Sequence, residues 1–535
     1  MEFIPMDRNY TEYTLKSTDT GKEDKLDTII DNPKFFPGEI IDNNMTILKE
    51  SDCRKNIIYG ILLLDSTTHG RKKNKFYYKF IPFIKNMPIC LVPYELKNSS
   101  FSKFKINKYA TCKFVNWDNK HPEFLLTNII GDVNDMSAFS EYLIGSYNIT
   151  HSLKKLNKLV KNNDIDSTIK LIINKYNLMD RTDLDIISID PPNCKDIDDA
   201  IGLTNNKHMC ILSIYISNVP LIIEYFNLWK QIGENISSLY LPDKKRPMLP
   251  FLLSENMCSL KENNIRIAMA LDITIDTHIN QIIKTSFIPC FIKVRKNFSY
   301  DEPQLITDKL YINITKLINN SGCFKNKFIN DSHEAIELLM IFMNKTAANK
   351  LADKSIVSPV YKSCSISNTS TENVPTKIDN FIKGWGGSGS NYTLEKKVHK
   401  LLEYELYTQV TSPIRRYVDI INMTYLNFLC KIELLPEFNT DLSYINIQVK
   451  NIKKVETQIN LLELANSDKF KNKIYSAFII EKENDYVIIY LNEINKILKI
   501  KGSNNLLLFQ PVKCKLHLFN YEYETNKKVR ATIVN

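Results

Sequence analysis

An aspartate-rich loop between two apolar runs is the feature that most restricts what this chain can fold into. The segment DIISIDPPNCKDIDDAIGL opens with a β-branched run that ends at Asp190, and two prolines stop this run. Four carboxylates then fall within ten positions: Asp190, Asp196, Asp198 and Asp199. A second apolar run, Cys210 to Ser217, follows and is expected to hold the loop against a sheet.

Four carboxylates packed together are electrostatically costly unless a divalent cation neutralises them. Carboxylates and waters around a hard cation are typical of Mg²⁺, and two such ions can clamp an in-line attack on phosphorus. A solvated acidic turn is the alternative, but Ala200 and Ile201 follow directly and apolar runs flank the loop. A calcium EF-hand is excluded, since Ala200 stands at a ligand position and no Glu closes the loop. The loop therefore predicts a Mg²⁺ site, with Mn²⁺ as the substitute ion.

A second segment, TSPIRRYVDIINM, combines a helix start with two arginines. Ser412 is expected to be the N-cap and Pro413 the first helical residue. Arg415 and Arg416 would then lie at the amino end, where the helix dipole disfavours a cation. They suit an external anion, because free N–H groups and guanidinium forks both bind phosphate. The alternative is that each arginine pairs with an internal carboxylate.

Composition limits the class of protein. A length of 535 residues suggests three or four domains at roughly 150 residues each. The net charge of +10 permits a polyanionic partner without requiring one. Eleven cysteines without a CxxC pair fit a reducing compartment, cytoplasmic or nuclear, better than disulfides or a zinc site. The longest apolar run, Ile57 to Leu64, is far shorter than the roughly 20 residues of a membrane span, so a membrane protein is excluded.

The pattern of the chain changes along its length. From about Gly38 to Gly131, short β-like runs separated by Pro, Gly and Asn predict small antiparallel barrels. One run, KFYYKFIPF, interleaves lysines with aromatics as in barrels that bind single strands; a half-buried strand with solvated lysines explains it equally well. Helical patterns dominate from Ser332 to about Phe470, and the last 60 or so residues return to strands.

The two motifs, D-x5-D-x-D-D-A and T-S-P-I-R-R-Y-x-D, together resemble the RNB catalytic domain of the ribonuclease II and RNase R family of hydrolytic exoribonucleases. The likeness continues in YLPDKKRPMLPFLLSENMCSLKEN and IELLMIFMN, and covers roughly residues 183 to 470. The branch of the eukaryotic exosome's catalytic subunit is the more similar one, without its PIN endonuclease. Flanking segments resemble a cold-shock barrel and an S1 domain.

This resemblance implies an α+β multidomain fold. Small β-barrels of the cold-shock or OB-like kind would flank a mixed α/β RNB catalytic domain, with a C-terminal S1-like barrel. The expected boundaries are a leader over 1–36, a partial cold-shock-like barrel over 37–75, a second such barrel over 76–140, a helical linker over 141–182, the RNB domain over 183–472 and the S1-like barrel over 473–535.

Site roles follow from the same resemblance, position by position. The four aspartates match the Mg²⁺-binding and catalytic carboxylates, and Asp198 matches the one that the family most needs for hydrolysis. Arg415 matches the arginine that contacts the scissile phosphate. Further residues are expected to bind RNA: Tyr240 and Tyr300 as a clamp on its 3′ end, Glu337 near the terminal ribose, and Arg416. Two departures are Asn218, where the family has Asp, and Met423, where it often has His.

The resemblance implies a 3′→5′ exoribonuclease that hydrolyses single-stranded RNA to nucleoside 5′-monophosphates by a Mg²⁺-dependent two-metal mechanism. The alternative is a catalytically inactive RNA-binding protein of the same fold, acting in an RNA-processing complex. Retention of the four aspartates and Arg415 counts against this alternative. A third possibility is a structural module of an exosome-like assembly; otherwise a monomer is expected.

Overall fold

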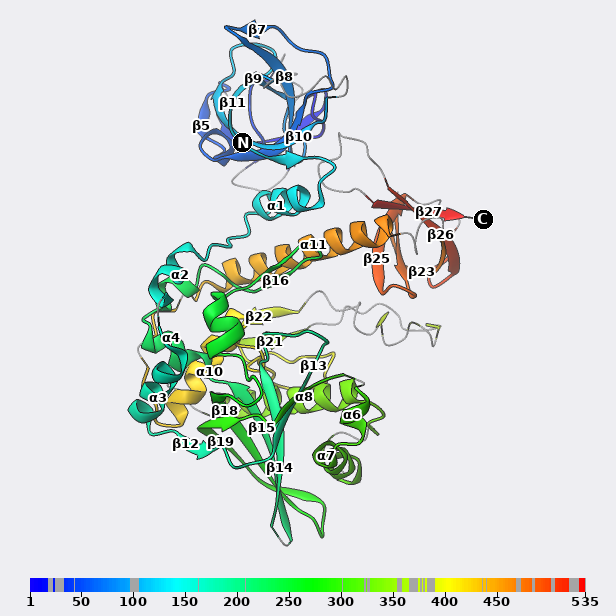
Figure 1. The fold of residues 1–535 in the computed structure, drawn as a ribbon. Coiled ribbons are helices and arrows are strands. Elements are labelled where there is room, and N and C mark those ends of the chain that lie inside the picture. The colour runs from blue at the N-terminus through cyan, green and yellow to red at the C-terminus, as the bar shows by residue number, and fades with distance from the viewer. Residues whose placement is uncertain are drawn as a thin grey trace. The chain divides into compact units, whose positions relative to one another are not determined.

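The structure is a computed structural model that divides into two units (Figure 1). The first comprises Met1–Thr150, Leu241–Lys244 and Asn451–Asn535, and the second comprises His151–Tyr240 and Lys245–Lys450. The structure describes residues 1–17, 23–24, 33–42, 44–96, 105–161, 163–206, 208–300, 302–321, 324, 328–353, 358–364, 374–375, 378, 381–382, 390–434, 436–438, 440–467, 473–483, 486–501, 506–518 and 529–534.

A seven-stranded sheet forms the centre of the second unit, in the order β12-β19-β18-β15-β14-β13-β20. Most neighbours pair antiparallel, while β13 runs parallel to β20 and places Asp190 opposite Ser299. The strands are β12 (Met179–Arg181), β13 (Ile186–Asp190), β14 (Asp199–Asn206), β15 (Met209–Ser217), β18 (Ile265–Asp276), β19 (Gln281–Lys293) and β20 (Lys296–Ser299).

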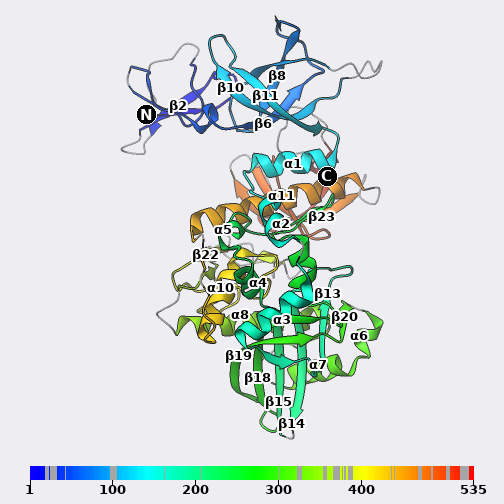
Figure 2. The same cartoon turned by 60° about the vertical axis from the view of Figure 1, so that its left-hand side comes forward.

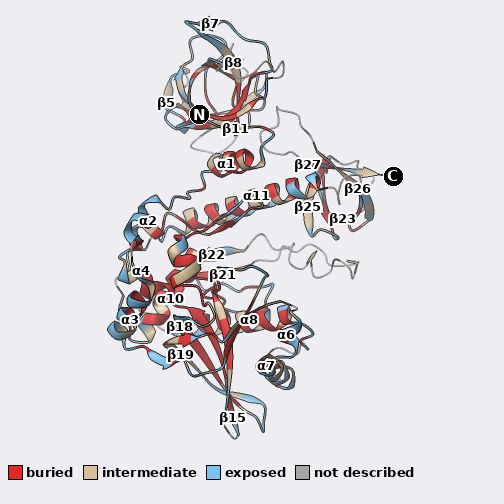
Figure 3. Cartoon of the chain, in the orientation of Figure 1, coloured by how far each residue is buried: buried red, intermediate tan, exposed pale blue. Residues whose placement is uncertain are grey.

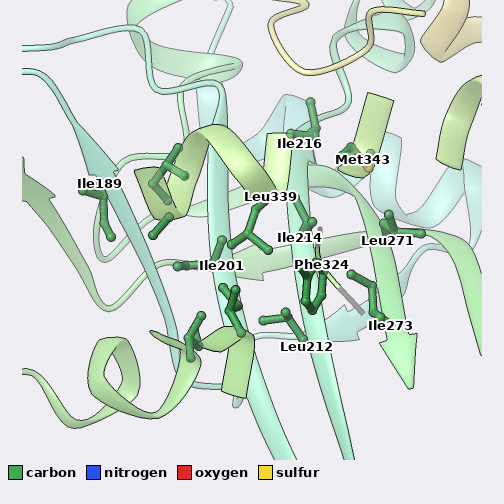
Figure 4. Packing of buried hydrophobic residues seen from close by; sticks show 14 of the residues in the cluster. Ile189, Ile201, Leu212, Ile214, Ile216, Leu271, Ile273, Phe324, Leu339 and Met343 are labelled. Carbon is green, nitrogen blue, oxygen red and sulfur yellow. The ribbon is translucent and has the colours of Figure 1, made fainter. Parts of the chain in front are cut away.

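Both faces of this sheet are covered, which explains why its central strands are almost continuously apolar. On one face Leu212, Ile214 and Ile216 of β15 pack with Leu339 and Met343, which belong to α8 (Figure 4). The opposite face carries the alternate residues, among them Ile186, Ala200, Tyr215, Ala268 and Ala270. The covering helices of the first face are α6 (Pro303–Ile306), α7 (Lys309–Asn320) and α8 (Ser332–Ala352), which Figure 2 shows from a second side.

A second helical cluster packs around Trp229, Ile267 and Tyr417, and its residues are mostly buried (Figure 3). Its helices are α2 (Lys154–Val160), α3 (Ile165–Tyr176), α4 (Val219–Tyr225), α5 (Trp229–Ile232), a π-helical turn (Leu253–Met257) and α10 (Tyr417–Leu429). Two small ladders complete the unit: β16 (Leu239–Tyr240) with β17 (Lys245–Arg246), and β21 (Tyr361–Ser363) with β22 (Asn391–Thr393).

The first unit contains three small curled sheets. The first, in the order β3-β2-β1-β4-β5, is made of β1 (Glu2–Pro5), β2 (Tyr13–Lys16), β3 (Glu23–Asp24), β4 (Ile40–Ile41) and β5 (Ile47–Lys49). The second, β6-β10-β11-β9-β8-β7, closes through pairing of β6 with β8 and is made of β6 (Ile58–Leu63), β7 (Arg71–Lys72), β8 (Lys75–Pro82), β9 (Cys90–Tyr94), β10 (Lys108–Asn116) and β11 (Glu123–Asp132).

The third sheet lies at the carboxyl end, in the order β25-β24-β23-β26-β27. Its strands are β23 (Ile474–Glu483), β24 (Tyr486–Leu491), β25 (Lys496–Lys501), β26 (Pro511–Leu518) and β27 (Val529–Val534). Further helices in the described residues are a 3₁₀ turn (Asp52–Arg54), α1 (Met136–Ser146) and α11 (Leu442–Asn466), whose first turns belong to the second unit. Within the described ranges, no helix combines the length and apolar character needed to cross a membrane.

The structure differs from the expected leader over residues 1–36. Strands β1 and β2 lie there, hydrogen-bonded to each other with Phe3 opposite Leu15, and both of these side chains are buried. Each strand has only four residues and buries few apolar side chains, so its pattern is too short to separate it from a polar tail. Part of the expected leader, residues 18–22 and 25–32, lies outside the described residues.

The boundary expected between residues 75 and 76 is also wrong, because it falls inside one sheet. Strand β7 pairs with β8 across it, with Arg71 opposite Phe76, and β8 pairs with β6. The second barrel therefore begins at β6 and includes the lysine-rich hairpin. The run KFYYKFIPF is a half-buried strand, as one of the two interpretations has it: Phe76 is exposed, whereas Tyr78 and Phe80 are buried.

Candidate active site

The aspartate loop connects two neighbouring strands of the sheet. Asp190 is the last residue of β13 and Asp199 the first of β14, and the two strands pair antiparallel. The loop therefore joins adjacent ends of neighbouring strands. The turn after β13 is closed by the Cys194 N–H, which donates to the Pro191 carbonyl at 3.1 Å. Asn193 has a φ of 63° in this turn, a left-handed conformation that Asn tolerates better than most residues.

Ser259, from the segment C-S-L, holds the aspartate loop through two hydrogen bonds to its backbone. Ser259 Oγ accepts from the Ile197 N–H at 3.1 Å and donates to the Lys195 carbonyl at 2.8 Å. The Leu260 N–H donates to the Ile197 carbonyl at 3.0 Å. The segment C-S-L thus holds the backbone of the aspartate loop, which is a physical reason for its presence.

Asp198 is almost fully buried and joins the loop to the arginine segment. Its Oδ1 accepts from the Ile414 N–H at 2.9 Å, and its Oδ2 accepts from Arg415 Nε at 3.0 Å. Burial raises the pKa of Asp198 to about 7, although the Arg415 charge and the Ile414 N–H act in the opposite direction. Arg415 is anchored through its Nη2 to Ser412 Oγ at 3.1 Å and remains 48% exposed. The guanidinium is therefore fixed at one edge and open at the other.

The expected helix start at Ser412 and Pro413 is wrong. Helix α10 begins at Tyr417, with Arg416 in an extended conformation at the N-cap position. The Ser412 N–H donates to the buried carboxylate of Asp419 at 2.8 Å, which favours a turn over continued helix. Both arginines instead pair with internal carboxylates, as the alternative interpretation has it. Arg415 pairs with Asp198, and Arg416 pairs with Asp419 at 2.8 Å.

Arg416 is accordingly not brought into the aspartate cluster. Asp419 is completely buried, and Arg416 Nη2 also lies 3.4 Å from Thr411 Oγ1. Burial lowers the pKa of Arg416 and is the largest single cause, but the Asp419 and Tyr392 charges and the hydrogen bond to Asp419 together outweigh it. The pKa of Arg416 is therefore raised. This arrangement anchors the turn that presents Arg415.

Asp196 has both oxygens engaged by one short hairpin. Tyr240 Oη donates to Asp196 Oδ2 at 2.6 Å, and Lys245 Nζ lies 2.6 Å from Asp196 Oδ1. Tyr240 and Lys245 are directly opposite each other in the β16–β17 ladder. Burial and the Asp196 charge raise the pKa of Tyr240, so its hydroxyl remains a donor. Lys245 was missed by the sequence analysis, and its only signal was the turn-forming segment Y-L-P-D-K-K.

Asp190 and Asp199 differ from the other two aspartates because no cationic side chain of the described residues forms an ion pair with them. Asp190 Oδ2 is buried and has no hydrogen-bond partner in the described part of the chain. Burial raises the pKa of Asp190 to about 6. Burial also raises the pKa of Asp199 well above its usual value, with the Asp190 charge as the next cause. Two ionised carboxylates so arranged repel each other unless a cation lies between them.

This pair fits Mg²⁺, which usually takes one or two carboxylates and completes its shell with water and substrate phosphate. A preformed site of three or more His, Cys, Asp or Glu side chains is absent from the described ranges. The reason is that Asp196 and Asp198 direct their oxygens to Lys245 and Arg415.

Tyr300 lies next to the cluster, since its N–H donates to the Asp190 carbonyl at 3.0 Å. Its ring stacks on His333 in the first turn of α8, with centroids 3.8 Å apart and planes 11° from parallel. Glu337 is exposed one turn further along the same helix. A lone histidine carries no sequence signal, so His333 was missed.

The two departures from the family pattern have structural explanations. Asn218 and Asn427 form a reciprocal pair of amide hydrogen bonds, each 2.8 Å, in a fully buried position. This pair needs no charge, so the absence of an aspartate leaves no unsatisfied donor. Met423 is buried in the apolar core cluster with Met343 and Leu426, so this position serves packing.

The comparisons with known proteins agree with this geometry. The RNB domain family matches residues 179–311. Ribonuclease R of Chlamydia pneumoniae is 23% identical over 372 residues, covering 56% of this chain and 54% of the relative. The exosome complex exonuclease RRP44 of Homo sapiens is 29% identical over 204 residues, covering 37% of this chain and 20% of the relative. The chain spans about half the length of the first relative and less of the second.

The fold is shared with solved structures along nearly the whole chain. The apo form of Mycoplasma genitalium RNase R has a TM-score of 0.70 at 18% identity, covering 94% of this chain and 95% of that one. The same protein has been solved in complex with ribose methylated single-stranded RNA. Yeast Ssd1, described as a pseudonuclease, has a TM-score of 0.60 at 16% identity, covering 88% of this chain and 67% of that one. The resemblance inferred from the motifs and the expected fold class are thus confirmed.

Proposed function

We propose that the chain is a 3′→5′ exoribonuclease that hydrolyses single-stranded RNA to nucleoside 5′-monophosphates in a Mg²⁺-dependent reaction. The observation that carries this proposal is that Asp190 and Asp199, which pair with no cationic side chain in the described residues, lie in the same cluster as the half-exposed guanidinium of Arg415. A phosphodiester needs both a metal ion and a positively charged fork, and this site offers a place for each.

Asp190 and Asp199 would hold the cation, since Asp190 Oδ2 is the buried oxygen without a partner. When bound, Mg²⁺ supplies a Lewis acid for the scissile phosphate and lowers the pKa of a bound water. Two ions acting together would require Asp196 and Asp198 as additional ligands. Asp198 also fixes the position of Arg415, so it serves both the cation and the fork.

Arg415 would bind the scissile phosphate. Its Nε and Nη2 are held by Asp198 and Ser412, which orients the guanidinium plane before substrate arrives. A preoriented fork loses little conformational entropy when it binds a phosphate.

Tyr240 and Tyr300 would contact the bases at the 3′ end. Tyr240 is 42% exposed although its hydroxyl donates to Asp196. The Tyr300 ring stacks on the His333 ring, which fixes its orientation beside Asp190. Stacking on aromatic rings tolerates every base, as a nuclease that degrades unrelated sequences requires.

The second candidate is an RNA-binding protein of the same fold that does not cleave; yeast Ssd1, which shares this fold, is described as a pseudonuclease. Against it stands the persistence of the full set of polar groups: four aspartates in one loop and Arg415 in contact with Asp198. A protein that only binds RNA gains nothing from four aspartates beside Arg415, because each one that is ionised opposes the binding of a polyanion.

Product analysis tests the proposal. Uniformly labelled poly(A) is incubated with the full chain in Mg²⁺, and the products are separated by thin-layer chromatography. We expect adenosine 5′-monophosphate as the product and no release in EDTA. Intact poly(A) that is bound but not shortened would support the non-cleaving alternative, and 3′-monophosphates would exclude attack directed by the proposed site.

A further inference from the structure

Lys245 is the charged side chain closest to the cluster that the proposed chemistry does not use. Its ammonium lies 2.6 Å from Asp196 Oδ1 and 3.9 Å from Glu255 Oε1, and its side chain is only 22% exposed. It also lies 5.6 Å from the centroid of the Tyr240 ring, within the range of a cation–π contact.

The hairpin geometry makes this contact specific. Tyr240 and Lys245 are register partners across the β16–β17 ladder, so both side chains leave the same face and meet at Asp196. Tyr240 supplies a neutral donor and Lys245 a cation, and together they engage both oxygens of the Asp196 carboxylate. A metal ion that approached Asp196 would therefore compete with Tyr240 and Lys245 for its oxygens.

The charges around the cluster are consistent with a single divalent ion. Asp190, Asp196, Asp198 and Asp199 carry four negative charges when ionised, and Lys245 and Arg415 contribute two positive charges in direct contact. The two negative charges that remain are those of Asp190 and Asp199, and one Mg²⁺ or Mn²⁺ balances them. A second ion would need either an entering phosphate or the departure of a cation.

We propose that Lys245 is a positioning residue that takes the place of a second divalent cation on Asp196 while RNA is absent. This inference rests on the proposed function and goes beyond it. Glu255 offers the displaced ammonium a second carboxylate within 4 Å of its present position. A base that contacts the Tyr240 ring would act on the same hairpin, so RNA binding and access of a second ion to Asp196 are coupled through β16 and β17.

The test counts bound ions in the full chain without RNA, with Mn²⁺ as the probe and electron paramagnetic resonance or calorimetry as the readout. We expect one Mn²⁺ in the wild-type protein, two in Lys245→Met, and one in Lys245→Arg, which keeps the positive charge. Lys244→Met is the matched control: Lys244 is the adjacent lysine, it is more than half exposed, and it pairs with Glu141 at 3.0 Å. This control is expected to bind one ion.

Adding a short ribose-methylated RNA to the wild-type protein is expected to raise the count from one to two. Two ions bound to the wild-type protein without RNA, or one ion in a folded Lys245→Met variant, would overturn the role of Lys245 and leave the proposed nuclease activity intact. Absence of any bound Mn²⁺ would overturn the proposed metal dependence as well. If Lys245→Met does not fold, the number of Mn²⁺ ions bound to the wild-type protein with and without RNA still tests the proposal. Two ions without RNA would contradict it.

Discussion

The four aspartates of the loop form two pairs that differ in what their oxygens contact. Asp196 and Asp198 each accept from one cation and one neutral donor. Asp190 and Asp199 have no ion pair with any described cationic side chain, whereas Asp198 is paired with Arg415 and still has a raised pKa because of its burial. Residues of one type in one loop therefore have different roles, and the difference follows from the neighbours that tertiary structure supplies.

At the scale of the residue, Asp198→Asn is expected to abolish hydrolysis while RNA affinity stays nearly unchanged. The change keeps the size of the side chain but removes the charge that orients Arg415, so we expect a loss of about 10²-fold or more in turnover. Mononucleotide release measures turnover, and a filter-binding assay measures affinity. Release at the wild-type rate would show that Asp198 has been assigned the wrong role.

The two arginines allow activity and stability to be separated. Arg415→Lys should lower turnover strongly with little change in melting temperature, because a lysine keeps the charge but loses the fork. Arg416→Lys should instead destabilise the protein by about 1–3 kcal/mol, because it weakens a hydrogen-bonded pair with the buried Asp419. Kinetics and thermal melts on both variants provide the comparison. Equal effects on turnover would contradict it.

At the scale of the element, long apolar runs were predictable and short ladders were not. Strands β13 and β15 follow from their β-branched sequences, and the loop between β13 and β14 follows from the prolines. The β16–β17 ladder has two residues per strand, too few for any periodicity, so the contact of Lys245 with Asp196 could not be foreseen. The start of α10 was misplaced because the partner of Ser412 is Asp419, a tertiary contact that overrides local capping preference.

The β16–β17 hairpin gives a prediction about product length. Tyr240→Ala removes a stacking ring worth roughly 1–3 kcal/mol, and short RNA depends on such contacts more than long RNA does. The variant should therefore leave a longer limit product, with the initial rate on long RNA little changed. Sizing on a denaturing gel measures this length.

Tyr240→Phe is the matched control, because it keeps the ring and removes only the hydroxyl that donates to Asp196. It should retain the wild-type product length. If both variants lengthen the limit product equally, the hydroxyl and not the ring is responsible. A lower melting temperature with unchanged product length in Tyr240→Ala would show that the ring serves only packing.

At the scale of the whole molecule, the sequence predicted the class of architecture better than its boundaries. Small barrels precede and follow a mixed α/β unit along the chain, as the change of pattern indicated. The barrel limits were misjudged because β1 and β2 bury few residues, such as Phe3 and Leu15, and because strand β7 has only two residues, both exposed. Contacts between residues far apart in sequence carry that information, and local composition does not.

The carboxylate cluster also predicts how stability depends on pH in the metal-free protein. The pKa of Asp190 is raised to about 6 and that of Asp198 to about 7, so the folded state holds protons that the unfolded chain has already released. Stability contributed by these groups is therefore present below about pH 4 and is lost as the pH rises to about 7.

Mg²⁺ should reverse this loss, because it binds the ionised carboxylates of the folded state. Thermal melts in EDTA and in Mg²⁺ at pH 5 and pH 7.5 measure the effect, with a larger increase expected at pH 7.5. Asp199→Asn should raise the melting temperature in EDTA and reduce the increase caused by Mg²⁺. An unchanged response to Mg²⁺ in this variant would exclude Asp199 as a ligand.

The central claim, hydrolysis from the 3′ end, is tested most directly by degrading a linear single-stranded RNA and a covalently closed circle of the same sequence in one Mg²⁺-containing reaction. The linear RNA carries a 5′ label and the circle an internal label. We predict that the linear RNA shortens progressively to a small 5′-labelled limit product while the circle persists. Cleavage of the circle, or persistence of both RNAs, would contradict the assignment of an exoribonuclease.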